Sequence, residues 1–357
     1  MKTGPGLKIG VLFNPFVERR QGADKEAGSE LAVESAAEQA AQALRAAGLR
    51  VALLPAAGSV ADLVRRILRA RVDAVVNLCE GFRGDPKFEA QAAGLLELMG
   101  LPATGCGSRT LAICQNKYQT KALLAARGIR TPRGWPAETC RDLPSAPPFP
   151  LMVKPNAEDG SRGIYPESVV RTRSALRRQI ARVVERYGAP ALVEEFLDGR
   201  EFNVAVVQAP ETRALPVSEI AFTDFPEGRP RIVDFPAKWD ASHPSYRRTV
   251  PVCPARISKA MAGNLSALAL RAFRELGLRG YGRVDFRTDA RGRPAIIEVN
   301  PNPDTNRGAG FMLALEAAGI PASDFWLGQV QLALSLKHAW KMPKCPQPRQ
   351  ARKGRTA

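Results

Sequence analysis

Four polar residues near the C-terminal end of the chain have the types and spacing expected of a magnesium site. Arg283 and Asp285 precede turn-forming residues at 288–292, and Glu298 and Asn300 follow them. Because residues two apart in a strand share one face, a β-hairpin would bring both pairs together. Two carboxylates and an amide oxygen suit Mg2+, which usually completes its coordination with water and substrate phosphates.

An arginine beside such a metal can stabilise negative charge on an oxyanion or on a transferring phosphate. The alternative is a surface hairpin crossed by salt bridges. That alternative explains Arg283 and Asp285, but it accounts poorly for the Asn-Pro-Asn-Pro run at 300–303. The metal site is therefore the favoured interpretation.

A second candidate segment begins with an apolar strand at 151–155 that contains Lys154. The loop Glu-Asp-Gly-Ser-Arg-Gly at 158–163 follows it, with Ser161 as its hydroxyl. Glycines allow backbone N–H groups to approach phosphate oxygens, and a lysine adds a point charge. The segment lacks the P-loop pattern G-x-x-x-x-G-K-[ST], and Gly-Ser turns are common, so it is weak evidence alone.

A third candidate is the apolar strand at 192–197, which contains two glutamates and is followed by a turn and Glu201. Such a strand can act as a hinge whose backbone reads an adenine edge, with Glu201 accepting from ribose hydroxyls. An ordinary hairpin with a charged edge is the alternative, and for this segment alone it is the simpler interpretation.

The elements around these segments indicate an α/β and α+β protein. Short aliphatic strands at 8–13, 50–54 and 73–78 alternate with helices at 29–47 and 61–70, which predicts an open parallel sheet. Without a G-x-G-x-x-G motif, a dinucleotide cofactor is not indicated. Further predictions are a helix at 114–127, an irregular Pro-rich linker at 131–150, helices at 173–187 and near 265–276, and the hairpin.

Taken in order, these segments resemble the ATP-grasp superfamily, specifically the D-alanine–D-alanine ligases, from about residue 73 to 335. The run 116–121 resembles the family's D-K-x-x-[ST]-K helix, 158–163 its glycine-rich lid, and 234–239 its mobile loop Y-x-x-K-Y. The closest matches are 280–286 and 297–300. The resemblance implies a two-subdomain ATP-grasp fold behind the N-terminal α/β domain.

The same resemblance implies roles for individual residues. Lys117 and Lys154 would contact ATP phosphates, while Lys238 would reach the γ-phosphate and Ser161 would belong to the lid. Adenine would be framed by Glu194, Glu195 and Leu197, and ribose by Glu201. The metal would be held by Asp285, Glu298 and Asn300, with Arg283 at the reacting centre.

The implied organisation has four parts. Residues 1–110 form the N-terminal α/β domain, 111–190 the central subdomain with the lid, 191–338 the C-terminal subdomain with the metal site, and 339–357 a basic disordered tail. The implied activity is that of an ATP- and Mg2+-dependent carboxylate–amine ligase, with Mn2+ as an alternative metal. It would act through an acyl phosphate on small-molecule substrates; a homodimer is compatible with the sequence.

The departures from the family pattern lie on the substrate side. Glu18 is the candidate for the glutamate that holds the first amine, although an Asn-Pro-Phe-Val run and a polar insertion surround it. The family's Leu-His-Gly segment appears as Leu-Cys-Glu-Gly, which places Glu80 where a cation could stand. Asp304 lies in a loop that replaces the family's serine-rich one. These changes leave D-alanine open as a substrate.

The amino-acid composition argues against several other classes of function. The net charge is +17, but the Arg and Pro-rich segment after residue 339 carries six basic residues and no acidic one, and the rest of the excess is spread along helices. Nucleic-acid binding is therefore not favoured. Two histidines are too few for most hydrolase triads, and the scattered positions of the six cysteines are typical of free thiols. Cys79 and Cys106 could be nucleophiles, but buried small residues are the favoured interpretation of both.

No apolar run approaches the roughly 20 residues needed to span a bilayer, and no leader pattern is visible, so we expect a cytoplasmic protein. Two alternatives to the ligase remain open. One is an ATP-grasp kinase that releases a phosphorylated product. The other is a non-catalytic basic binding protein on a ligase scaffold.

Overall fold

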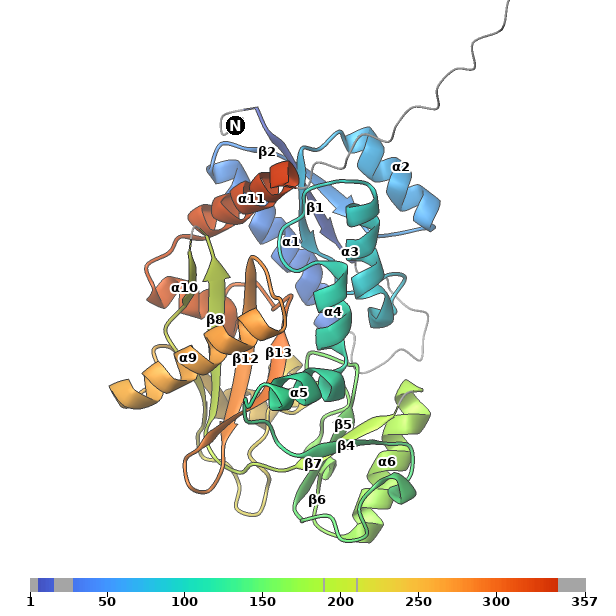
Figure 1. Cartoon of the computed structure of the whole chain (residues 1–357), viewed down its shortest axis with the longest axis vertical. Helices are drawn as coiled ribbons and strands as arrows, with labels where there is room; N and C mark the ends of the chain where they lie inside the picture. Colours follow the sequence, from blue (N-terminus) through green and yellow to red (C-terminus); the bar gives the residue numbers. More distant parts are fainter. Residues whose placement is uncertain (1–5, 16–27, 189, 210, 340–357) are drawn as a thin grey trace, which may run out of the picture.

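A computed structural model describes residues 6–15, 28–188, 190–209 and 211–339 (Figure 1). The candidate substrate residue Glu18 and the predicted tail at 340–357 lie outside the described residues. The described chain builds three sheets with helices packed against them, a mixed α/β architecture as predicted.

The N-terminal sheet is parallel, with strand order β2-β1-β3, as the alternation of strands and helices predicts. Its elements are β1 (Lys8–Phe13), α1 (Gly28–Ala46), β2 (Arg50–Pro55), α2 (Val60–Ala70), β3 (Ala74–Leu78) and α3 (Glu89–Leu98). Val11 packs toward α1 and the neighbouring Leu12 toward α2 and α3, because successive side chains point to opposite faces. Both faces of the sheet are therefore covered.

Two short helices lead into the next sheet: most of the helix predicted near 114–127 is present as the second of them, and a break at residue 116 separates it from the first. They are α4 (Ser108–Gln115) and α5 (Lys117–Ala126). Asn116 separates them with extended backbone, and its side chain accepts from the N–H of Gln119 as the N-cap of α5. The break places Lys117 in the first turn of a new helix.

The second sheet is antiparallel, with order β4-β7-β5-β6. Its elements are β4 (Gly134–Ala137), β5 (Leu151–Pro155), β6 (Val169–Val170), α6 (Arg173–Tyr187) and β7 (Ala191–Glu195). The Pro-rich stretch at 131–150 was predicted to be irregular. In the structure, β4 lies within this stretch and pairs with β7. An edge strand tolerates proline since one of its sides needs no donors. Val153 and Val193 pack on α6, which covers one face.

The third sheet has the order β11-β10-β8-β12-β13, with β9 also paired to β8. Its strands are β8 (Glu201–Gln208), β9 (Thr212–Ala214), β10 (Ser218–Phe222), β11 (Thr249–Val252), β12 (Tyr281–Thr288) and β13 (Pro294–Asn300). Helix α9 (Lys259–Glu275) covers the face of Val204 and Val206, and α10 (Gly310–Ala317) covers the face of Ala205 and Val207. Consecutive residues of β8 thus pack against helices on opposite faces of the sheet.

The C-terminal helix α11 (Ala322–Ala339) packs back against the N-terminal sheet and α1 (Figure 1). Trp326 is almost fully buried, and its ring centroid lies 5.8 Å from that of Tyr281, the first residue of β12. Short helices complete the described chain: η1 (Pro86–Phe88), η2 (Cys140–Asp142), η3 (Pro166–Ser168), α7 (Phe235–Trp239) and α8 (Pro244–Arg248). The contact between Trp326 and Tyr281 connects the predicted metal hairpin to α11, which packs against the N-terminal sheet.

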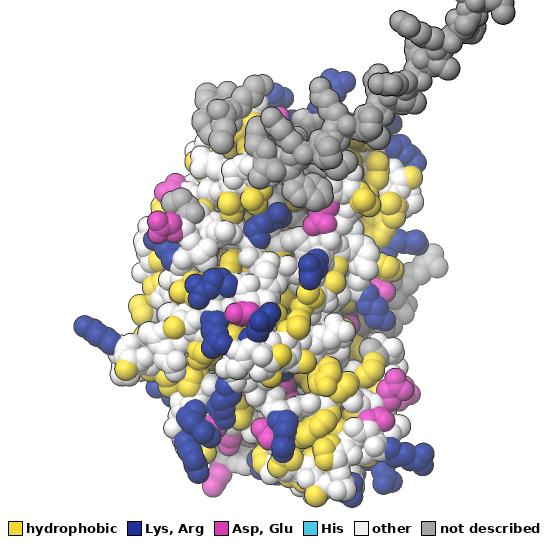
Figure 2. Space-filling model, viewed as in Figure 1, with side chains coloured by type: hydrophobic (Ala, Val, Ile, Leu, Met, Phe, Trp, Pro, Cys, Tyr) yellow, Lys and Arg dark blue, Asp and Glu magenta, His cyan; other side chains and the backbone are white. Residues whose placement is uncertain are grey.

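On the face in Figure 2, Lys and Arg side chains are scattered over several elements and form no single basic patch. Within the described residues, no helix combines the length and apolarity needed to cross a bilayer. The visible charge distribution therefore agrees with solvated helix faces more closely than with a polyanion-binding surface.

Candidate active site

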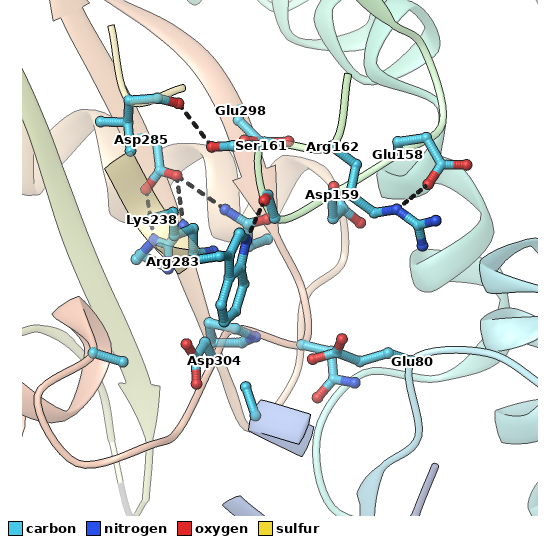
Figure 3. A pocket seen from close by; sticks show the side chains of 18 of the residues that line it. Glu80, Glu158, Asp159, Ser161, Arg162, Lys238, Arg283, Asp285, Glu298 and Asp304 are labelled. Carbon is cyan, nitrogen blue, oxygen red and sulfur yellow. Dashed lines mark hydrogen bonds and ion pairs between the residues drawn. The ribbon is translucent and has the colours of Figure 1, made fainter. Parts of the chain in front are cut away.

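A cavity of about 1360 Å3 lies between the two antiparallel sheets and reaches the carboxyl end of β3 (Figure 3). Thirteen of the predicted site residues line it, from all three sheets and the loops between them: Glu80, Lys154, Ser161, Glu194, Glu195, Leu197, Glu201, Lys238, Arg283, Asp285, Glu298, Asn300 and Asp304. Lys117 does not line the cavity, but it contacts Glu298 directly.

The hairpin of β12 and β13 forms as predicted and brings the four metal-site candidates together. Arg283 pairs with Asn300 and Asp285 with Glu298 in the strand register. Asn300 Nδ2 donates to Asp285 Oδ2 at 3.0 Å, and Arg283 donates to both oxygens of Asp285 at 2.7 and 2.8 Å. Two carboxylates and the amide group of Asn300 therefore lie side by side at the cavity wall.

This donor set fits Mg2+ better than it fits a metal ion whose ligands all come from the protein. Within the described residues, no group of three or more His, Cys, Asp or Glu side chains is placed to hold a metal ion. Asp285, Glu298 and Asn300 offer three oxygens at the wall of an open cavity. Magnesium is commonly held by one or two carboxylates and takes its other ligands from water and phosphates.

Lys117 connects the metal hairpin to the lid loop. Its Nζ lies 2.8 Å from Glu298 Oε1 and 2.8 Å from Asp159 Oδ1, and its side chain is almost fully buried. Burial alone would raise the pKa of Glu298, but the ammonium groups of Lys117 and Lys154 outweigh it and lower this pKa to about 2. Glu298 is therefore ionised at neutral pH, which is the state that its predicted role as a metal ligand requires.

The carboxylate of Glu194 is buried between two lysines. Its Oε1 lies 2.9 Å from Lys154 Nζ, and its Oε2 accepts from Lys121 Nζ. Any contact between residue 194 and an adenine would therefore involve its backbone or stem. Lys121 was missed as a functional residue, although it lies four positions after Lys117 on α5, a spacing that puts both on one helix face.

Two loops close over the cavity and are bonded to each other (Figure 3). Ser161 Oγ donates to the carbonyl of Val233 at 2.8 Å, and Trp239 Nε1 donates to the carbonyl of Gly160 at 2.7 Å. The ammonium of Lys238 lies 4.9 Å from the centroid of the Trp239 ring. The predicted lid and mobile loop thus meet, with Ser161 and Lys238 on the cavity side.

The segment 196–200 connects the second sheet to the third, since β7 and β8 belong to different sheets. This arrangement favours the hinge interpretation over a simple hairpin. Arg287, which sequence reasoning missed, donates to the carbonyls of Gly199 at 3.1 Å and Arg231 at 2.7 Å. Its Nη1 lies 3.6 Å from Glu201 Oε2, so Arg287 fixes both the hinge and the predicted ribose ligand.

The substrate-side candidates Glu80 and Asp304 face the same cavity (Figure 3). Asn14 accepts from the backbone N–H of Glu80 at 2.7 Å and donates to the carbonyl of Gly81 at 2.9 Å, so the end of β1 holds this turn. The Glu80 side chain is exposed to the cavity, but protein atoms around the cavity limit its contact with bulk water. Reduced hydration, and then the charge of Asp304, raise its pKa to about 8.

Glu89 is a buried carboxylate at the cavity wall that sequence reasoning missed. It begins α3, is 7% exposed, and accepts from Asn302 Nδ2 at 3.2 Å. Burial, followed by the charges of Asp159 and Glu80, raises its pKa well above the usual value. No local pattern distinguished this glutamate from a solvated one, because its burial depends on the loop after β13.

Cys79 and Cys106 are buried, as predicted, while Cys140 and Cys253 are partly exposed. Burial raises the pKa of both Cys79 and Cys106 to about 12. Both thiols are therefore protonated at neutral pH. Since the thiolate is the reactive form, neither cysteine is suited to act as a nucleophile.

Comparisons with known proteins agree with this geometry. The family described as the D-ala D-ala ligase C-terminus matches residues 126–326. A D-alanine–D-alanine ligase of Gluconobacter oxydans is 35% identical over 269 residues, covering 74% of this chain and 82% of that protein. One of Stutzerimonas stutzeri is 32% identical over 317 residues, covering 88% of this chain and 90% of that protein.

The fold is also shared with solved structures. The crystal structure of D-alanine–D-alanine ligase from Bacillus anthracis complexed with ATP superposes with a TM-score of 0.72 at 19% identity, covering 93% of this chain and 99% of that one. The ligase from Coxiella burnetii gives the same TM-score, with 94% of this chain covered and 96% of that one.

The chain belongs to the D-alanine–D-alanine ligase-like family of ATP-grasp proteins. It is an ATP-dependent ligase, an enzyme of the class that forms carbon–nitrogen bonds.

Proposed function

We propose that this enzyme activates a substrate carboxylate as an acyl phosphate, using ATP and Mg2+ or Mn2+, and transfers the acyl group to an amine. The observation that carries the proposal is the convergence of Asp285, Glu298, Asn300 and Arg283 on one cavity face, with Lys154 lining the same cavity. The homology to D-alanine–D-alanine ligases supports the same chemistry. A divalent cation, when bound, would supply charge neutralisation for the phosphates.

The protein's own residues account for the first step. Lys154 and Lys238, which both line the cavity, would neutralise phosphate charge, with Lys117 in contact with the proposed metal ligand Glu298. The substrate carboxylate would then attack the γ-phosphorus, forming a carbon–oxygen–phosphorus bridge as the bond to ADP breaks. The bonded lid and mobile loop would keep water away from the acyl phosphate.

In the second step the amine attacks the acyl carbon, loses a proton, and inorganic phosphate leaves. The oxyanion of the tetrahedral intermediate requires a nearby donor. Arg283 is suited to that role because its side chain, which is 17% exposed, lines the cavity. Adenine would lie at the hinge, near the backbone of Glu194, Glu195 and Leu197, and ribose near Glu201.

The substrates themselves are proposed only as a carboxylate and an amine. Glu80 and Asp304 lie where the substrates would bind, and both differ from the family pattern noted in the sequence. Asp304 on this wall favours a substrate that presents an amine or another hydrogen-bond donor, and Glu80, whose pKa is raised to about 8, is mainly protonated at neutral pH and can itself donate. D-alanine, the substrate named for the relatives, is one candidate among several.

The test is ATP-dependent phosphate release across a matrix of amino acids and small carboxylates, D-alanine included, with product masses measured. A product equal to acid plus amine minus water, with ADP and phosphate released, supports the ligase. A product heavier by a phosphoryl group would indicate a kinase instead. Salt-sensitive binding of polyanions without any ATP turnover would contradict both and favour the binding-protein alternative.

A further inference from the structure

Helix α5 places a second lysine, Lys121, in the interior behind the proposed phosphate site. Lys121 is 5% exposed, and its Nζ donates to Oε2 of Glu194, which is 3% exposed. Lys154 Nζ lies 2.9 Å from the other oxygen of the same carboxylate. We refer to Lys121, Glu194 and Lys154 as the Lys–Glu–Lys cluster.

The cluster carries more positive than negative charge when all three groups are ionised. Its balance is one carboxylate against two ammonium groups, in a region with little access to water. Burial, outweighing the attraction of Glu194, together with the charge of Lys154 lowers the pKa of Lys121 to about 7. Burial would raise the pKa of Glu194, but the two lysines outweigh this effect and lower it. Glu194 therefore stays ionised, and each of its carboxylate oxygens contacts one lysine.

Of the two lysines, only Lys154 lines the cavity, on the same strand face as Met152. Lys121 lies behind it, on the α5 side. If Glu194 had Lys154 as its sole partner, the two charges would cancel and little attraction would remain for an anion in the cavity. With Lys121 on the second oxygen, Glu194 is already neutralised, and the charge of Lys154 acts toward the cavity, where it also helps to lower the pKa of Glu298.

We propose that Lys121 is a positioning residue for ATP: it neutralises and orients Glu194, which leaves the ammonium of Lys154 free to attract a phosphate. The inference rests on the proposed role of Lys154 in ATP binding. It assigns Lys121 no contact with substrate. It also explains why a lysine is buried where an apolar side chain would pack at lower cost.

The rival explanation is that Lys121 only attaches α5 to β7. The two explanations predict different behaviour when Glu194 is changed as well. At a pH below about 7, where Lys121 is ionised, Lys121→Met alone reduces the net charge of the cluster from one to zero. Lys121→Met with Glu194→Gln returns it to one, because Lys154 then stands without a carboxylate beside it. A purely structural attachment is lost equally in both variants.

The experiment measures dissociation constants for ATP with Mg2+ and for adenosine by calorimetry, on the full-length protein, with thermal unfolding as a check of folding. Lys121→Met is expected to bind ATP roughly tenfold more weakly, as loss of one nearby charge implies, with adenosine unchanged. The double variant is expected to recover most of the ATP affinity. Lys259→Met, which removes an exposed charge on α9, is the matched control and should leave both constants unchanged.

Lys121→Gln is the second variant in case the methionine variant does not fold, since glutamine can still donate to Glu194 but carries no charge. It should weaken ATP binding as Lys121→Met does. Unchanged ATP affinity in either folded variant, equal losses for ATP and adenosine, or no recovery in the double variant would overturn the inference. Failure of the wild-type protein to bind ATP would instead overturn the proposed function, and this inference with it.

Discussion

Lys117 and Glu298 join the first turn of α5 to the metal hairpin, with Nζ and Oε1 2.8 Å apart. The contact places a positive charge directly behind a proposed metal ligand. It also keeps Glu298 ionised, because it helps to lower the pKa of this carboxyl to about 2. In the absence of a cation, Lys117 and Arg283 neutralise the carboxylates that would otherwise repel each other.

Replacing Glu298 by glutamine is expected to abolish ATP turnover, by at least about 100-fold, while the fold is retained. Glutamine has nearly the same shape but lacks the charge that holds a divalent cation. Mn2+ binding measured by electron paramagnetic resonance should weaken in parallel, and Asp285→Asn should behave alike. Glu167→Gln, at an exposed position, is the control. Near-normal turnover in either hairpin variant would contradict the metal assignment.

Glu89→Gln is expected to stabilise the protein at neutral pH. The folded state raises the pKa of this carboxyl, so it binds more protons than the unfolded chain above pH 4.5, and wild-type stability falls as pH rises through that window. Glutamine removes this penalty and can still accept from Asn302. Each unit of raised pKa corresponds to about 1.4 kcal/mol.

The measurement for Glu89 is the difference in Tm between variant and wild type across pH 4 to 8. The difference should be near zero at pH 4 and grow toward pH 8. A difference independent of pH would show that packing, and not ionisation, determines the effect of this substitution.

Trp239→Phe is expected to loosen the lid. The substitution keeps an aromatic ring but removes the N–H that donates to the Gly160 carbonyl at 2.7 Å. Loss of one such hydrogen bond, worth about 1 kcal/mol, should speed hydrogen exchange of amides at 159–163 about fivefold. The ratio of ATP hydrolysed to product formed should also rise, because water reaches the acyl phosphate. Unchanged exchange at these amides would argue against the loop contact as a lid restraint.

Gly199→Ala is expected to destabilise the protein by about 1–3 kcal/mol. A Cβ at this position would overlap the hydroxyl and carbonyl oxygen of Thr288, so the hinge would have to move away from β12. Gly263→Ala is the matched control: this glycine lies in α9 with open space around it, and alanine there should stabilise by about 0.5–1 kcal/mol. Chemical denaturation measures both. Equal effects of the two substitutions would contradict the close approach at the hinge.

Much of the architecture could be predicted because it depends on local patterns. Aliphatic runs separated by amphipathic helices predicted the parallel sheet, and period-two spacing around a turn predicted that Asp285 and Glu298 would face the same way. The break at Asn116 was missed, since the helical pattern continues through it and only the N-cap geometry separates α4 from α5.

The sequence alone determined which residue types are available for ATP and metal chemistry, and in which order along the chain they occur. Only the tertiary structure decided that Lys121 and Lys154 share one carboxylate, that Arg287 holds the hinge, and that Glu89 is buried beside Asn302. Each of these contacts joins residues that are distant in the sequence, either across neighbouring strands of one sheet or between a sheet and a helix or loop. Their existence depends on how three sheets pack together, and no local periodicity encodes that packing.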